Sequence, residues 1–121
     1  MSTEKITIVG GGVLGVQIGL MCAYTGHDTT FWLRSESSIS RTQPKIDRYS
    51  SLMLADLEGA KKLIGNPMGG FLYPRGLIKT WEGTSAESID DLIAQANKNF
   101  ADKVHIELNM SKAFEDADIV I

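Results

Sequence analysis

Three glycines at a fixed spacing, Gly10, Gly12 and Gly15, constrain the fold of this chain more than any other feature. Residues 6–9 precede them and are β-branched throughout, with apolar side chains on both faces apart from one threonine. Such a run is typical of a strand that is buried on both sides in a parallel sheet. The glycines therefore follow the end of a predicted strand, where the chain has to turn sharply.

An apolar helical pattern begins directly after the glycines. Four apolar residues recur at the spacing i, i+4, i+7 and i+8, which places them on one face of a helix. They are Leu14, Ile18, Met21 and Cys22. Gly26 is typical of a helix C-terminus, and residues 29–33 form a β-branched and aromatic run that predicts a second strand. Strand, turn, helix and strand make a βαβ unit, whose crossover we expect to be right-handed.

The pattern changes after the second strand. We expect a polar, serine-rich loop over residues 34–42, and then a helix that Thr42 caps and that has Pro44 in its first turn. Glycine and proline are frequent in residues 65–83, which predicts an irregular connector. The apolar stripe of the helix before it consists of Ile46, Tyr49, Met53, Ala60 and Ile64.

The last forty residues predict one more long helix and two more strands. A helix is expected to begin near Thr84, which has capping-box spacing with Glu87. Alternating apolar residues predict a third strand over 104–108, Ser111 can cap a short helical turn, and residues 118–121 begin a fourth strand. The apolar face of the long helix consists of Ile89, Leu92, Ile93, Ala96 and Phe100.

This order of elements predicts an α/β fold, namely a Rossmann-type, doubly wound parallel sheet with a long helical excursion after the second strand. A strand entering a buried sheet is an unusual last element for a complete domain, so we expect the sheet to be incomplete at the C-terminus. We therefore interpret residues 1–121 as a single, partial dinucleotide-binding domain, with the substrate and dimerisation domain absent from this chain.

Each glycine of the motif has a physical task in binding a diphosphate. Gly10 permits the tight turn, Gly12 has no side chain to keep the diphosphate away from the backbone, and Gly15 lets the helix pack against the strand. The backbone N–H groups of Gly12, Val13, Leu14 and Gly15 would face the ligand at the positive end of the helix dipole. The motif thus predicts an NAD or NADP site; the alternative is a glycine turn that binds nothing.

The end of the second strand is where such proteins contact the adenosine ribose. NAD enzymes usually have an Asp or Glu there, but this chain has Leu33, followed by Arg34 and Ser35. Arg34 is suitably placed to bind a 2′-phosphate, and Ser35 and Arg41 can add donors. We therefore favour NADP slightly over NAD; the alternative is that Arg34 stacks on the adenine or faces solvent.

Composition excludes several other classes of protein. The net charge of −3, without runs of like charge, argues against nucleic acid as the main partner. A single cysteine rules out an internal disulfide, and no apolar run approaches the roughly 20 residues of a membrane span. Asp116 and Asp118 are only two positions apart and have no matching ligands elsewhere in the sequence, so they do not predict a metal site. We expect a soluble, cytoplasmic protein that binds neither membranes nor metals.

Two segments carry a resemblance to a known family. Residues 5–15 with Gly26-His27-Asp28, and residues 113–121 at the far end, resemble the 3-hydroxyacyl-CoA dehydrogenase family. The resemblance implies NAD-linked interconversion of 3-hydroxyacyl-CoA and 3-ketoacyl-CoA in fatty acid metabolism, in a homodimer when the protein is complete. It also implies that residues 42–101 help to receive the CoA moiety, and that the catalytic histidine and glutamate lie beyond Ile121, so no residue of this chain is assigned a catalytic role.

Two alternatives remain from the sequence. Trp32-Leu33-Arg34 also resembles the ketopantoate reductases, which use NADPH but usually have a shorter connection between the second and third strands. A nucleotide sensor without redox activity is the other alternative, because the substrate half is missing from this chain.

Overall fold

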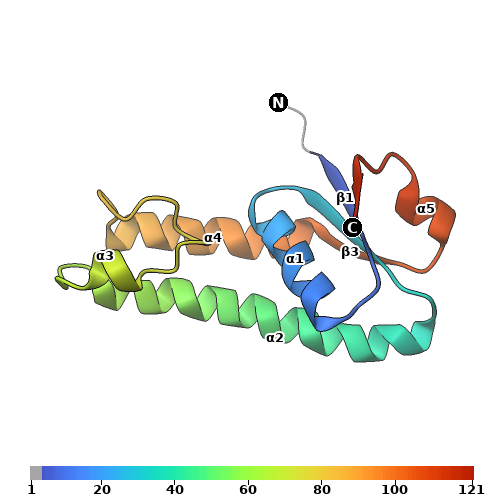
Figure 1. The fold of residues 1–121 in the computed structure, drawn as a ribbon, viewed down its shortest axis with the longest axis horizontal. Helices are drawn as coiled ribbons and strands as arrows, with labels where there is room; N and C mark the ends of the chain where they lie inside the picture. Colours follow the sequence, from blue (N-terminus) through green and yellow to red (C-terminus); the bar gives the residue numbers. More distant parts are fainter. Residues whose placement is uncertain (1–3) are drawn as a thin grey trace. The chain divides into compact units, whose positions relative to one another are not determined.

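The computed structural model describes residues 4–121 and places four parallel strands in one sheet (Figure 1). The strand order is β3-β2-β1-β4. The strands are β1 (Lys5–Val9), β2 (Asp28–Trp32), β3 (Val104–Glu107) and β4 (Ile119–Val120). The helices are α1 (Val13–Tyr24), α2 (Glu36–Ala60), α3 (Gly69–Leu72), α4 (Ala86–Asp102) and α5 (Met110–Phe114), with a 3₁₀ turn η1 (Lys61–Leu63). The predicted α/β fold, with a long helix after the second strand, is confirmed.

The backbone groups into two compact units. The first consists of residues 4–50 together with Lys98–Ile121 and contains the whole sheet. The second consists of Ser51–Asn97. None of the helices between residues 4 and 121 is both long enough and apolar enough to cross a membrane.

Helices cover both faces of the sheet in the first unit. On one face α1 packs against β1 and β2 so closely that a Cβ added at Gly19 would lie 2.3 Å from Cζ of Phe31. On the other face, the buried Thr7 hydroxyl of β1 donates to the Ala113 carbonyl of α5 at 2.6 Å. The Trp32 ring of β2 lies 6.3 Å from the Phe114 ring on that same face. The sheet is therefore wound on both sides, as the sequence predicts.

The buried face of α1 differs from the predicted one. Leu14 is 70% exposed, whereas Ile18, Met21 and Cys22 are only half-buried. Nearly every position of α1 is apolar, so the 3.6-residue period does not distinguish one face from another. Small residues decide instead, because they let the helix approach the strands. The buried residues are Val16, Gly19, Leu20 and Ala23.

The end of α1 is as predicted. Gly26 has φ +99°, and its N–H donates to the Ala23 carbonyl at 2.9 Å. The next N–H, that of His27, donates to the Cys22 carbonyl at 3.0 Å. These two bonds form a Schellman motif, which satisfies the last carbonyls of the helix.

The start of α2 contradicts the prediction. The helix begins at Glu36, so residues 36–42 are not a loop, Thr42 is not its cap, and Pro44 lies inside the helix. Serine is a weak helix breaker whose hydroxyl can bond its own helix, as Ser40 does by donating to the Ser37 carbonyl at 2.8 Å. Tertiary packing overrides this weak preference, because Thr42 is only 2% exposed.

The caps of α4 and α5 are also shifted from the predicted residues. Ser85 caps α4 in place of Thr84, since its hydroxyl accepts from the N–H of Ser88 at 3.1 Å while the Ser88 hydroxyl accepts from the N–H of Ser85 at 2.9 Å. Ser88 thus takes the part expected of Glu87. Asn109, rather than Ser111, caps α5 by accepting from the N–H of Lys112 at 3.1 Å.

The second unit has its own small core. The predicted connector over residues 65–83 is mostly irregular and contains only the single turn α3. The rings of Tyr73 and Trp81 stack there at 5.4 Å. Lys61 pairs with Asp90 and, at 3.1 Å, with Glu58, and these hydrogen bonds raise the pKa of Lys61. The buried apolar residues are Leu57, Ala60, Leu77, Ile78, Ile89 and Ala96.

Candidate functional site

The turn between β1 and α1 leaves backbone donors open. Gly10 has φ +99°, a conformation that glycine adopts readily, and its N–H donates to the Trp32 carbonyl at 2.9 Å. Gly12 is the N-cap of α1 and gives no side-chain cap, and the first helical bond runs from the N–H of Val16 to the Gly12 carbonyl at 2.9 Å. The N–H groups of residues 12–15 therefore have no partner in the described chain. No acidic residue lies in the first turn to compete for them.

The glycines of this turn differ in the space around them. A Cβ added at Gly12 would meet nothing within 4 Å, so the turn is open on the side where a ligand can approach. A Cβ at Gly15 would lie 3.3 Å from Cγ2 of Ile8, which is the close helix–strand packing that the motif predicts. A Cβ at Gly11 would lie 2.0 Å from the hydroxyl oxygen of Thr42, because α2 packs directly against the glycine turn.

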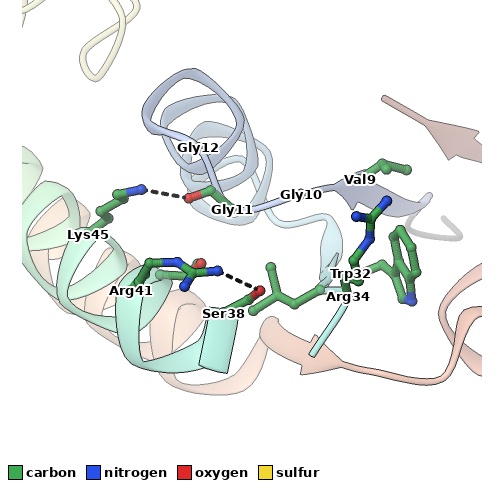
Figure 2. A pocket seen from close by; sticks show the side chains of 11 residues that line it. Val9, Gly10, Gly11, Gly12, Trp32, Arg34, Ser38, Arg41 and Lys45 are labelled. Carbon is green, nitrogen blue, oxygen red and sulfur yellow. Dashed lines mark hydrogen bonds between the residues drawn. The ribbon is translucent and has the colours of Figure 1, made fainter. Parts of the chain in front are cut away.

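A pocket of about 390 Å³ opens between this turn, the end of β2 and the first turns of α2 (Figure 2). Its volume falls within the range of small-molecule sites, which is roughly 300–1,000 Å³. It is lined by Val9, Gly10, Gly11, Gly12, Trp32, Leu33, Arg34, Ser38, Arg41, Thr42 and Lys45.

The charged side chains that line the pocket are all basic. Arg34 extends from the end of β2, alongside Trp32 in Figure 2, whereas Arg41 and Lys45 extend from α2. The Arg41 guanidinium donates to the Ser38 hydroxyl at 3.2 Å, and the Lys45 ammonium donates to the Gly11 carbonyl at 3.2 Å. No carboxylate lines the pocket, although the chain as a whole has a net charge of −3. The pocket therefore suits an anionic ligand.

The structure brings together five of the nine predicted cofactor-binding residues, and four lie outside the pocket lining. Val13 and Leu14 are 47% and 70% exposed. Their predicted role concerns only their backbone N–H groups, so it does not require their side chains to line the pocket. The Ser35 hydroxyl lies 2.9 Å from the hydroxyl of Ser37, and Gly15 packs against β1. The five that line the pocket are Gly10, Gly12, Leu33, Arg34 and Arg41.

Sequence reasoning missed the contribution of α2. Ser38, Thr42 and Lys45 line the pocket together with Arg41, and none of the three was predicted as a site residue. Their spacing of i, i+3, i+4 and i+7 is that of one helix face, so the signal was present. It stayed hidden because residues 34–42 were interpreted as a loop.

These residues fit the chemistry of a phosphorylated dinucleotide. Open N–H groups at a helix N-terminus bind a diphosphate, and guanidinium and ammonium groups bind phosphate oxygens. The pocket lining contains no histidine, cysteine or carboxylate, so it offers binding groups but no acid–base pair. In the described part of the chain, no group of three or more His, Cys, Asp or Glu side chains is arranged to hold a metal ion.

A second pocket, of about 420 Å³, lies elsewhere in the first unit. Its one charged residue is Asp47, and most of its lining is apolar or uncharged. Carboxylates repel phosphate, so this pocket does not suit the same ligand. The other lining residues are Leu20, Gln43, Ile46, Ser50, Phe100, Ala101, Val104 and Ile106.

Comparisons with known proteins give matches only at the level of structure. No protein-family model matches the sequence, and no curated protein matches it. FadB2 of M. tuberculosis is similar in structure, with a TM-score of 0.50 and 12% sequence identity over 99% of this chain. A diketoreductase matches with a TM-score of 0.46 and 17% identity, again over 99% of this chain. The chain spans 30% of the length of FadB2 and 31% of that of the diketoreductase. At 12% identity, the likeness to FadB2 shows that the chain shares the fold of one part of that protein.

Proposed function

We propose that this chain is the cofactor-binding part of an NAD(P)-dependent oxidoreductase that interconverts 3-hydroxyacyl-CoA and 3-ketoacyl-CoA. One observation carries the cofactor part of the proposal: unpartnered N–H groups at the start of α1 lie beside a pocket whose charged residues are all basic. The substrate part is supported by the resemblance of residues 5–15 and 113–121 to the hydroxyacyl-CoA dehydrogenases. The fold shared with part of FadB2 is consistent with both.

In this proposal the chain binds and orients the cofactor. The N–H groups of residues 12–15 hold the diphosphate, and Arg34 and Arg41 hold a 2′-phosphate on the adenosine ribose. The bound nicotinamide supplies hydride transfer. We place the catalytic residues outside these 121 residues, so the chain should bind the cofactor without turning over substrate. An acyl-CoA substrate, a cytoplasmic location and a homodimer in the complete protein belong to the same proposal.

The basic pocket also favours NADP over NAD, and this observation supports a second candidate. Leu33 is 1% exposed and Arg34 follows it, the combination that resembles the NADPH-dependent ketopantoate reductases. The long segment between β2 and β3, residues 33–103, favours the hydroxyacyl-CoA family instead. A nucleotide sensor would have the same pocket, and the sequence that follows Ile121 in a longer gene product would distinguish it from an enzyme.

Cofactor titration of the 121-residue chain tests the proposal. NADPH and NADH are added separately while the tryptophan fluorescence of the chain is followed, because Trp32, one of its two tryptophans, lines the pocket. We expect both to bind, with NADPH tighter. A chain that is folded by circular dichroism and binds neither dinucleotide would refute the proposed function.

The variant Arg34→Met tests the choice of cofactor, because it keeps the aliphatic stem and removes the charge. Arg34 is exposed, so its contact with a 2′-phosphate should be worth about 1.5 kcal/mol, at the low end for a charged hydrogen bond. We therefore expect NADPH to bind about tenfold more weakly and NADH to change much less. Arg48→Met, an exposed position of α2 outside the pocket, is the matched control. Equal losses for the two dinucleotides would contradict the assignment.

A further inference from the structure

We infer that Lys45 is a ligand of the cofactor's diphosphate, which makes α2 a second wall of the diphosphate site opposite the start of α1. The inference rests on the proposed function and deepens it by assigning separate tasks to the basic residues of the pocket. Arg34 and Arg41 distinguish NADPH from NADH, whereas Lys45 binds the part that the two dinucleotides share.

The position of its ammonium separates Lys45 from the two arginines. Its Nζ lies 3.2 Å from the Gly11 carbonyl oxygen, next to Gly12, where the open N–H groups of α1 begin. Arg41 lies one turn earlier in α2 and bonds to Ser38, and Arg34 belongs to the end of β2. In Figure 2 the Lys45 side chain reaches toward Gly11, whereas Arg41 points toward Ser38 and Arg34 lies beside Trp32. Lys45 is thus the basic residue beside the expected diphosphate.

Packing of α2 fixes this position. Thr42, three residues before Lys45 and hence on the same helix face, is 2% exposed and packs against Gly11. No side chain fits between them, since a Cβ on Gly11 would lie 2.0 Å from the Thr42 hydroxyl oxygen. Lys45 is therefore carried by a rigid contact, and its side chain is half-buried. An ammonium held in this way loses less conformational entropy on binding than a free surface lysine.

The hydrogen-bonding capacity of Lys45 leaves room for a ligand. An ammonium has three donors, and the structure assigns one of them to the Gly11 carbonyl. The two remaining donors are available to phosphate oxygens in a pocket without a competing carboxylate. The α1 N-terminus carries only about half a positive charge, so most of the charge of a dianionic diphosphate has no cationic partner there. Lys45 supplies a full charge on the facing wall.

The test compares ligands that contain or lack the diphosphate. Lys45→Met should weaken NADH and NADPH by the same factor, about tenfold, which is the loss of ~1.4 kcal/mol. The same variant should bind adenosine 2′-monophosphate as the unmodified chain does, because that ligand has no diphosphate. Arg41→Met should show the opposite pattern, with adenosine 2′-monophosphate and NADPH weakened more than NADH. Lys45→Arg, which keeps the charge, should recover most of the NADH affinity, and Lys98→Met, outside the pocket, serves as the control for a lost surface charge.

Each result has a defined meaning. If the unmodified chain binds NADH and Lys45→Met binds it equally well, the inference is wrong while the proposed function stands. A loss confined to NADPH and adenosine 2′-monophosphate would also overturn the inference, since Lys45 would then contact the 2′-phosphate. If the unmodified chain binds no dinucleotide, the proposed function fails and the inference fails with it.

A second measurement needs no variant and therefore covers the case in which Lys45→Met does not fold. The unmodified chain is acetylated with a limiting amine reagent in the presence and absence of inorganic pyrophosphate, and each lysine is followed by peptide mass spectrometry. We expect pyrophosphate to slow the acetylation of Lys45 at least severalfold and to leave Lys98 unchanged. Equal acetylation of Lys45 with and without pyrophosphate, at a concentration that displaces NADH, would overturn the inference.

Discussion

The contact between α2 and the glycine turn predicts an unusually specific effect of adding one methyl group at Gly11. The backbone of Gly11 lies outside the left-handed region, so alanine is free to adopt its φ. The obstacle is steric. A Cβ there would lie 2.0 Å from Oγ1, 2.8 Å from Cγ2 and 2.9 Å from Cβ of Thr42. All three distances are shorter than non-bonded carbon contacts, which are optimal at roughly 3.5–4.0 Å, so α2 or the turn has to move.

The expected cost of Gly11→Ala is about 1–3 kcal/mol in the free energy of unfolding, the usual penalty for extra volume in a packed region. Urea unfolding followed by far-UV circular dichroism measures it, as a lower midpoint with an unchanged m-value. Gly12→Ala is the matched control. A Cβ at Gly12 meets nothing within 4 Å, so only the weaker N-cap preference of alanine remains, at most ~1 kcal/mol.

A double-mutant cycle identifies Thr42 as the cause. Thr42→Ala removes Oγ1 and Cγ2, the atoms nearest the added methyl group, and leaves only the 2.9 Å contact with Cβ. Gly11→Ala should therefore cost at least ~1 kcal/mol less in the Thr42→Ala background, which is within the range of couplings between residues in contact. The reasoning is refuted if Gly11→Ala costs the same in both backgrounds, or costs no more than Gly12→Ala. Either result would mean that α2 is not packed on the turn.

Two further predictions concern α1. Gly19→Ala should destabilise the chain by up to about 2 kcal/mol, because crowding of the buried Phe31 ring outweighs the roughly 1 kcal/mol gained in helix propensity. Gly59→Ala, in α2 with nothing within 4 Å, should instead stabilise it, and urea midpoints that moved the same way for both variants would contradict this account. Burial raises the pKa of the Cys22 thiol, so the folded chain should react more slowly with iodoacetamide at pH 8.5 than the urea-unfolded chain. Because burial raises the pKa of Cys22, the protonated thiol favours the folded state, and this part of the free energy of unfolding is complete below the unfolded pKa of about 8.5 and declines as pH rises above it. Equal alkylation rates for the folded and unfolded chains would show that the thiol is not shielded.

The sequence predicted those parts of the fold that local chemistry determines. β1 and β2 are runs of β-branched and aromatic residues, and the turn between β1 and α1 needs the positive φ of Gly10. Gly26 ends α1 by the same kind of local rule. These features depend on a few adjacent residues, so they can be recognised without knowing what packs against them.

The incorrect predictions concern features that depend on distant residues. α1 is apolar around most of its circumference, so its buried face is chosen by which small residue fits against the strands, and Gly19 fits against Phe31. The start of α2 is decided by the packing of Thr42 on Gly11, thirty-one positions earlier in the chain. Because this one error hid the helix face that carries Lys45, the predicted site also lacked Ser38, Thr42 and Lys45, three of the residues that line the pocket. The fold-level prediction was unaffected, since the alternation of strands and helices along the chain is the same wherever α2 begins.

The same stretch of chain connects the choice of cofactor to the start of α2. Leu33 occupies the place where the resembling family has its acidic residue, and here its side chain is 1% exposed while its N–H donates to the Glu107 carbonyl at 3.0 Å. The Leu33 side chain is apolar, so it offers no acceptor to a ribose hydroxyl. The ribose therefore cannot be recognised there in the way the family does it. The first side chain that points outward is Arg34, and α2 begins two residues later and brings Arg41 and Lys45 to the same pocket. In the proposed function, burial of Leu33 thus moves cofactor recognition from the strand to the helix that follows it, and replaces an acidic contact by basic ones.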